Sequence, residues 1–176
     1  MIIKGNIVTL RFIEPKDLES IREMTNDPEQ EYMIGGWSFP AAVKHQEDWY
    51  QRVLSDKNNL RLSIDYEGEF VGLVTLTSID WKNKRAESGI RLSLAAPKRK
   101  GIATDALNSI LCYAFQELNL NRVYATVLDH NEASLRLHAR CGYVVEGTLR
   151  NSVYKRGEYH DEIQLAILKN DYLKNK

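Results

Sequence analysis

A basic loop leading into a helix is the part of this sequence whose residue types best suit phosphate binding. Lys98, Arg99 and Lys100 stand directly before Gly101, Ile102 and Ala103, where an apolar helix is expected to begin. The first N–H groups of a helix lack intrahelical partners and carry partial positive charge, and small residues let an anion approach them. A phosphate-binding site is therefore predicted. The alternative is a basic turn that is simply exposed to solvent.

Polar side chains recur along one face of a short helix expected between Asn131 and Gly142. Asn131, Ser134 and His138 stand at positions i, i+3 and i+7, which places them on one stripe. Asn131 is a favourable N-cap, and Gly142 stands where a left-handed C-cap is expected. Because the packing of a helix needs no aligned polar stripe, a polar ligand is predicted along it. A plain helix cap is the alternative for Asn131.

Together the two motifs resemble those of the GNAT superfamily of acyl-CoA-dependent N-acetyltransferases, and the resemblance covers nearly the whole chain. In that family the loop reads Gln or Arg, two residues, Gly, one residue, then Gly or Ala. Residues 98–103 match this pattern except that Lys stands first. The later family signature corresponds to Asn131, Ser134, His138 and Gly142-Tyr143. Residues 146–150, 155–157 and 159–161 resemble the branch of ribosomal-protein-alanine, spermidine and amino-sugar acetyltransferases.

The resemblance implies acetyl-CoA as co-substrate and direct acetyl transfer to a primary amine. The loop backbone would hold the pyrophosphate, and the strand just before it would pair with the pantetheine arm. The Asn131 amide would bond the same arm, and Ser134 or Arg140 would lie near the phosphates. The implied cofactor-binding residues are Leu92, Ser93, Leu94, Lys98, Arg99, Lys100, Gly101, Ile102, Ala103, Thr104, Asn131, Ser134 and Arg140.

Two side chains are candidates for moving protons. An amine acceptor with a pKa of about 10 is protonated at neutral pH, so a base is needed. The resemblance implies Glu87 as that base, acting through water, and an ordinary exposed carboxylate is the alternative. His138 stands where many family members carry Tyr; it would protonate the leaving sulfur, serve as the base instead, or merely fill space. The four histidines show no ligand spacing, so no metal is predicted.

The segment of residues 31–40 stands where family members shape the acceptor site. It combines Gly35 and Gly36 with large side chains, which suits a lid. Candidates for substrate binding are Glu31, Trp37 and Phe39, and the alternative for the two aromatic residues is a core anchor. A polyamine, a peptide N-terminus and an amino sugar all remain open as acceptors.

The elements expected around these residues form an antiparallel meander with helices. Strands are expected at residues 6–13, 60–66, 69–79, 85–94, 122–127, 143–151 and 158–168. Helices are expected at 15–24, from Pro40 to about Asp56, and at 102–118. The second helix would bury Val43, Gln46, Trp49, Tyr50, Val53 and Leu54. The predicted fold is a GNAT-like α/β domain over residues 1–176, with a mixed, mostly antiparallel sheet of about seven strands and helices on both faces.

Composition supports a single catalytic domain and argues against several other classes. The 176 residues carry 24 basic and 24 acidic side chains without a positive stripe, so nucleic-acid binding is not predicted. Cys112 and Cys141 are expected to be buried free thiols. No signal pattern or apolar run of roughly 20 residues is present, so a cytoplasmic protein is expected, without a membrane partner. Relatives often form homodimers, but no exposed apolar stripe demands one here.

A different class of function is a domain of the same fold that binds CoA without catalysis, as a sensor or interaction module. Loss of the phosphate loop or of every proton-transfer side chain would favour it, and both are present. A nucleotide-binding α/β protein of another fold is disfavoured because no glycine fingerprint opens the chain.

Overall fold

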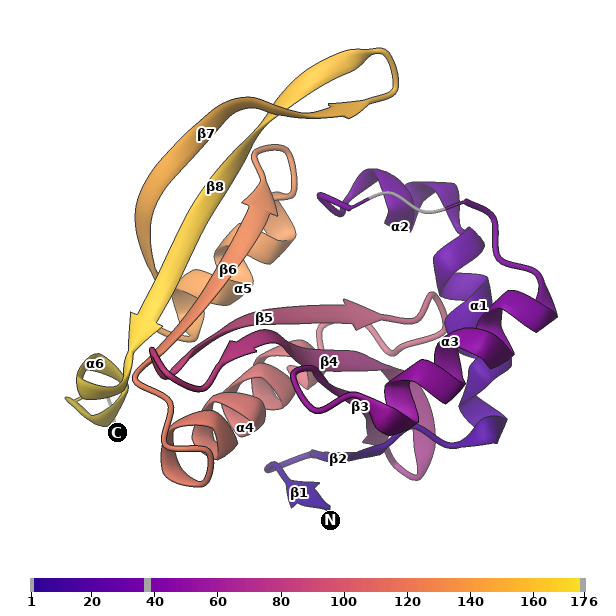
Figure 1. The fold of residues 1–176 in the computed structure, drawn as a ribbon, viewed down its shortest axis with the longest axis horizontal. Coiled ribbons are helices and arrows are strands. Elements are labelled where there is room, and N and C mark those ends of the chain that lie inside the picture. Colours follow the sequence, from indigo (N-terminus) through magenta and orange to yellow (C-terminus); the bar gives the residue numbers. More distant parts are fainter. Residues whose placement is uncertain (1, 37–38, 175–176) are drawn as a thin grey trace.

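The computed structural model describes residues 2–36 and 39–174, and its strands form one eight-stranded sheet (Figure 1). The strands are β1 (Ile3–Lys4), β2 (Val8–Phe12), β3 (Leu60–Tyr66), β4 (Glu69–Asp80), β5 (Arg85–Leu92), β6 (Arg122–Leu128), β7 (Val144–Lys155) and β8 (Glu158–Leu168). Their order across the sheet is β1-β2-β3-β4-β5-β6-β8-β7. The expected mixed, mostly antiparallel sheet is confirmed, and the short β1 makes the strand count eight rather than seven.

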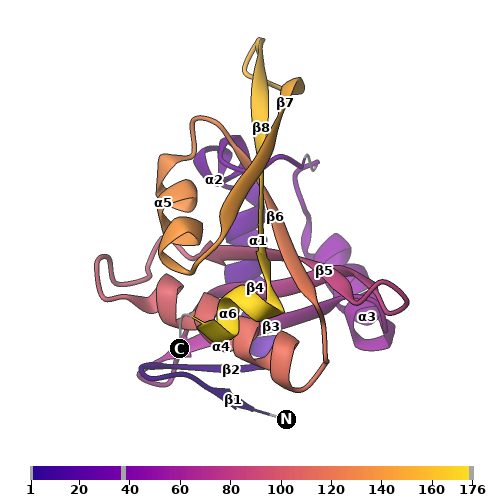
Figure 2. The same ribbon diagram turned by 90° about the vertical axis from the view of Figure 1, so that its left-hand side faces the viewer.

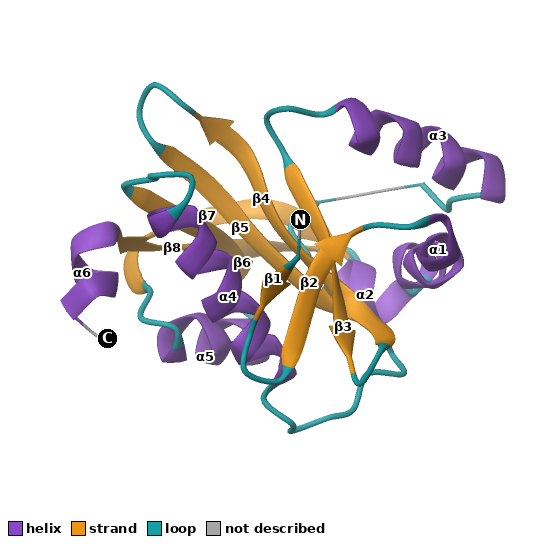
Figure 3. Cartoon of the chain, turned by 90° about the horizontal axis from the view of Figure 1, so that it is seen from below, coloured by secondary structure: helices purple, strands orange, loops and turns teal. Residues whose placement is uncertain are grey.

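Helices cover both faces of this sheet, as expected. They are the 3₁₀ helix η1 (Pro15–Asp17) and the α-helices α1 (Leu18–Asn26), α2 (Pro28–Tyr32), α3 (Val43–Ser55), α4 (Ile102–Gln116), α5 (Glu132–Arg140) and α6 (Lys169–Lys174). Figure 3 shows α1 and α3 on one side of the sheet, and α4 and α5 on the other. The larger core lies under α4 and includes Leu76, Leu107 and Phe115. A smaller core on the other face joins Ile13, Ile21 and Val53.

The sheet opens between β5 and β6. These two strands pair in parallel at residues 85–87 and 122–124, while β6 pairs with β8 along its whole length. Beyond Glu87, β5 continues to Leu92 beside β4, and Figure 1 shows β5 and β6 diverging from this point. Beyond Glu87, the edge of β5 that faces β6 is therefore not paired with that strand and borders the opening. The expected strand end at Leu94 was wrong by two residues, because a turn closes from Ala96 N–H to Ser93 O.

The segment between α1 and α3 differs most from expectation. The break at residues 26–28 does end α1, but Pro28 opens the additional helix α2, capped by the Asp27 side chain. The next long helix, α3, begins at Val43 rather than at Pro40. Asn26 causes this delay, because its side-chain amide exchanges two hydrogen bonds with the backbone of Ala41, of 2.7 and 2.9 Å.

Several expectations about burial were also wrong. Val43 and Leu54 are 59% and 49% exposed, because only a narrow stripe of α3 faces the core. Cys141 is buried and Cys112 is half-buried, although both are free thiols as expected. The edge strand β7 exposes Val144 and Val145, so an exposed apolar strip does exist. Among the described residues, no helix combines the length and apolar character needed to cross a membrane.

Candidate active site

The basic loop turns sharply into α4 because two of its residues have left-handed backbone conformations. Arg99 has φ 60° and Gly101 has φ 81°. Gly101 is the N-cap, and the first backbone bond of the helix runs from Asp105 N–H to Gly101 O. The N–H groups of the first three helical residues precede that bond and have no intrahelical acceptor. Ile102 is 2% exposed and fixes the helix start in the core, while the basic side chains before it lie in solvent.

The end of α5 lies beside the start of α4. Cys141 Sγ is 3.9 Å from Thr104 O, and Arg140 directly precedes Cys141. Arg140 also lines a cavity of about 1040 Å³ between β1, α4 and α5. Ser134 lies six residues before Arg140, and it is therefore about 9 Å from Arg140 along the helix axis, since each helical residue adds about 1.5 Å. Of the two side chains expected near the phosphates, Arg140 is therefore the better placed.

Backbone groups of β5 face the opening at alternate residues. Ser93 N–H donates to Val71 O of the neighbouring chain segment at 2.8 Å, so the Ser93 amide faces β4. Because the direction of backbone groups alternates along a strand, Leu92 presents its N–H and C=O to the opposite edge. Of the three residues expected to pair with the pantetheine arm, Leu92 has the suitable orientation, whereas Leu94 lies in the following turn.

The polar stripe on α5 is linked internally by hydrogen bonds. Asn131 Oδ1 accepts from Ser134 N–H at 3.1 Å, which confirms the N-cap. Asn131 Nδ2 donates to Met33 O at 2.9 Å and so ties α5 to the segment after α2. His138 Nδ1 lies 2.8 Å from Ser134 O, and the Ser134 hydroxyl lies 3.3 Å from the same nitrogen.

His138 is a buried, neutral imidazole with one nitrogen unused. The residue is 2% exposed, and its ring packs edge-on against Tyr143, whose hydroxyl is 2.7 Å from Ser88 Oγ. Burial lowers the pKa of His138, and its hydrogen bond to Ser134 only partly opposes this. Because Nδ1–H donates to Ser134 O, the lone pair is on Nε2. Within the described chain Nε2 has no hydrogen-bond partner, and such a buried orphan suits a proton acceptor.

Glu87 lies on the other face of β5, close enough to Glu162 of β8 for the charge of Glu162 to affect it. Side chains alternate along a strand, so Glu87 points away from the face that buries Ser88. Burial raises the pKa of Glu87, and the negative charge of Glu162 raises it further. Glu87 is half-buried, so the alternative of an ordinary exposed carboxylate is wrong. Glu162 was not foreseen, because no local pattern indicates that β8 would lie next to β6.

The expected acceptor segment is held beside Glu162 by a buried lysine that sequence reasoning also missed. Lys155 is 5% exposed and donates to the carboxylate of Glu31, to Glu31 O and, at 2.6 Å, to Gly36 O. Gly35 passes so close to Glu162 that a Cβ there would lie 2.6 Å from Glu162 Oε1. The charge of Glu31 is therefore balanced, and the unbalanced acidic character lies with Glu87 and Glu162.

Of the two aromatic residues proposed for substrate binding in this segment, the structure describes one. Trp37 lies outside the described residues. Phe39 is 74% exposed, so the alternative of a core anchor is wrong for it. Phe39 lines a second cavity of about 360 Å³, together with Ile34, His45 and Gln46. This cavity lies on the same side of the sheet as α1 and α3.

The comparisons with known proteins agree with this architecture. A model of the acetyltransferase (GNAT) domain matches residues 8–144. This chain belongs to the GNAT acetyltransferase family. The putative ribosomal N-acetyltransferase YdaF of Bacillus subtilis (strain 168) is 31% identical over 173 residues, covering 94% of this chain and 93% of that protein. The predictions of a GNAT fold and of an N-acetyltransferase are thus confirmed for this family member.

Polyamine acetyltransferases are further relatives of this GNAT protein. Spermidine N(1)-acetyltransferase of Escherichia coli (strain K12) is 30% identical over 166 residues, covering 94% of this chain and 88% of that protein. The crystal structure of spermidine N-acetyltransferase from Vibrio cholerae in complex with CoA and spermine matches with a TM-score of 0.89. It is 28% identical and covers 96% of this chain and 99% of that chain.

Proposed function

We propose that this enzyme acetylates a primary amino group of a small cationic amine of the polyamine class. The observation that carries the proposal is the half-buried Glu87, which lies at the end of the β5–β6 pairing beside the opening, with the charge of Glu162 close enough to raise its pKa. Two nearby carboxylates attract a molecule with several ammonium groups and repel anions. The relatives that act on spermidine support the same class of acceptor.

Acetyl-CoA fits the groups that the chain presents as the acetyl donor. The unpaired N–H groups at the start of α4 suit the pyrophosphate, and Arg140 suits a further phosphate. The open edge of β5 at Leu92 suits an extended arm with amide groups. The thioester of acetyl-CoA supplies the activated acetyl group, and the protein's part is to orient it and to move protons.

Glu87 and His138 have different proposed roles. Glu87 accepts a proton from the bound ammonium, which frees the lone pair that attacks the thioester carbonyl. After attack the nitrogen carries one surplus proton. Because His138 lies on the opposite face of the sheet from Glu87, water in the opening between β5 and β6 relays this proton to His138 Nε2. The resulting imidazolium gives this proton to the departing thiolate and becomes neutral again, while Glu87 releases its proton to solvent. This order matches the neutral resting state of His138, whose pKa is lowered by burial.

The test is thiol release from acetyl-CoA with spermidine, an alanine-starting peptide, an amino sugar and an amino acid. We expect release with spermidine, and a loss of kcat of about 10²- to 10⁴-fold in Glu87→Gln and in His138→Ala. The exposed Glu69→Gln on β4 is the matched control and should keep full activity. Release with the peptide alone would indicate a protein N-terminus instead. Tight acetyl-CoA binding without release for any acceptor would indicate the non-catalytic module.

The same evidence supports proposals about the whole protein. We infer that residues 1–176 act as a single acetyltransferase domain, because β8 lies between β6 and β7 and so joins the C-terminal part to the matched region.

We propose a cytoplasmic location, and a homodimer in which a second copy covers the exposed edge of β7. Fractionation of the source cells and sedimentation analysis would test these two points.

A further inference from the structure

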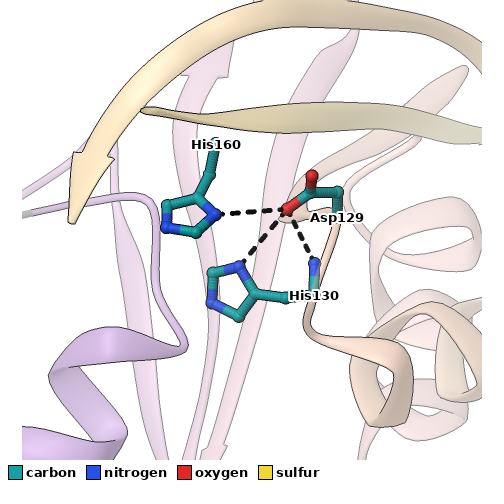
Figure 4. A group of neighbouring side chains, drawn as sticks. All are labelled: Asp129, His130 and His160. Carbon is teal, nitrogen blue, oxygen red and sulfur yellow. Dashed lines mark hydrogen bonds and ion pairs between the residues drawn. The ribbon is translucent and has the colours of Figure 1, made fainter. Parts of the chain in front are cut away.

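We propose that Asp129, His130 and His160 bind a divalent transition-metal ion, with zinc as the best match. One ligand atom of each residue lies within 4.8 Å of those of the other two, and Figure 4 shows the three side chains converging. Asp129 and His130 follow the end of β6, and His160 lies on β8. The site does not include Glu87 or His138, although His160 stands two positions from Glu162 on β8 and His130 directly precedes Asn131.

The spacing of the three groups suits metal ligands better than hydrogen-bonded partners. Asp129 Oδ1 lies 3.3 Å from His130 Nδ1 and 3.7 Å from His160 Nδ1. Good N–H···O bonds measure about 2.7–3.2 Å, so both contacts are long. Ligands about 2.05 Å from a tetrahedral zinc ion lie about 3.3 Å apart, which is close to both distances. Two sides of the cluster thus have nearly the length of an edge of a zinc tetrahedron, and the third side, between the two imidazoles, is at most 4.8 Å long.

The hydrogen bonding of His130 prepares it for this role. His130 Nε2 lies 3.0 Å from Tyr32 O, so this nitrogen donates and the lone pair is on Nδ1, toward Asp129. A metal-bound histidine usually donates its second ring N–H to a carbonyl or carboxylate in the same way. Tyr32 also stacks on the His130 ring, with 4.4 Å between centroids, and meets His160 edge-on. The ring orientation is therefore held without an ion.

The cluster is accessible to solvent, and together with Tyr32 it connects α2, β8 and the segment after β6. The side chain of Asp129 is 43% exposed, while those of His130 and His160 are 20% and 12% exposed. An ion can therefore reach the site, and water can complete its coordination. Tyr32 ends α2, so a bound ion would hold the end of this helix against β6 and β8. Two imidazoles and one carboxylate favour zinc over magnesium or calcium, which prefer oxygen ligands.

Cobalt(II) is the probe for this proposal, because its visible absorption reports coordination geometry directly. Untagged, chelator-treated protein would be titrated with Co²⁺ and then with competing Zn²⁺. We expect one saturable ion per chain, with an absorption band typical of tetrahedral coordination that zinc abolishes. His160→Gln and Asp129→Asn should each weaken Co²⁺ binding at least tenfold. His45→Gln removes an exposed histidine of α3 and is the matched control that should bind Co²⁺ as the wild type does.

Two results would overturn the proposal. One is the absence of a saturable band up to millimolar Co²⁺, and the other is equal binding by His160→Gln, Asp129→Asn and the wild type. Circular dichroism of each variant checks its fold. If His160→Gln fails to fold, Asp129→Asn gives the same test through the most exposed of the three side chains. Because metal affinity is measured without acetylation, its outcome is independent of the proposed acceptor.

Discussion

At the scale of single residues, the protonation state of the Glu87 carboxylate sets the pH range in which the acceptor amine can lose its proton. Burial raises its pKa, and Glu162 raises it further. A protonated Glu87 cannot accept a proton, so kcat/KM should fall as the pH falls through this raised pKa. Replacing Glu162 by Gln removes a negative charge and lowers the pKa of Glu87. We therefore expect the acidic limb of the pH profile to move to lower pH in Glu162→Gln.

The control for this shift is Glu158→Gln, on the same strand but exposed. Its profile of kcat/KM against pH should overlay that of the wild type. An unmoved acidic limb in Glu162→Gln would show that another group controls the limb, and the effect of Glu162 on Glu87 would then have no catalytic role.

Gly35 provides a second prediction at the residue scale, because a side chain there would meet Glu162 Oε1 at 2.6 Å. Glu162 would have to turn away to admit a methyl group. We expect Gly35→Ala to raise KM for the amine several-fold with little change in KM for acetyl-CoA. At the neighbouring Gly36 an added Cβ meets nothing within 4 Å, so Gly36→Ala should keep both constants. Equal effects of the two substitutions would contradict this account.

At the scale of elements, Lys155 fastens the end of α2 and the following loop to the β7–β8 hairpin. Its ammonium group donates to three oxygens from Glu31 and Gly36, and only 4% of its side chain is exposed. Figure 2 shows this hairpin standing out from the rest of the sheet, and Arg156 beside Lys155 adds further contacts to Pro28 O, Glu29 and the Tyr32 ring. The position of the acceptor segment thus depends on a contact between distant parts of the chain.

Lys155→Met should lower the free energy of unfolding by about 2 kcal/mol, because it leaves the carboxylate of Glu31 without its cation. This is below the cost for a fully buried pair, since the Glu31 side chain is 26% exposed. Urea denaturation measures the change. Arg136→Met breaks an exposed pair with Glu132 on α5 and should cost less than about 0.5 kcal/mol. A comparable cost for both variants would mean that the Lys155 link adds no more than a surface pair.

At the scale of the whole molecule, β7 is a 12-residue edge strand that exposes Val144 and Val145 at 63% and 58%. A long edge strand with exposed apolar side chains and unpaired backbone groups favours pairing with another chain. If a second copy covers β7, Val145→Asp should weaken self-association at least about tenfold. Sedimentation velocity over a range of concentrations measures this. Val43→Asp places the same charge on an exposed site of α3 and should leave association unchanged; a monomeric wild type would contradict the proposal.

The sequence by itself determined the features that depend on near neighbours. Periodicity and capping residues predicted most strands, α4 and the Asn131 cap, because these signals act within one or two turns of the chain. The left-handed backbone of Gly101 was not predicted, because the sequence indicated only a small residue that lets an anion approach. The early start expected for α3 failed, since the bonds between Asn26 and Ala41 join two segments that no local pattern relates.

Only the tertiary structure decided which distant side chains meet. Glu162 lies near Glu87 because β8 pairs with β6 and β6 pairs with β5, and this strand order is not contained in either residue's surroundings in the sequence. Lys155 reaches Glu31 across 124 positions, and His130 meets His160 through the same pairing of strands. Local propensities select the elements, whereas burial of the whole apolar surface selects their arrangement, so contacts between elements follow from the complete fold.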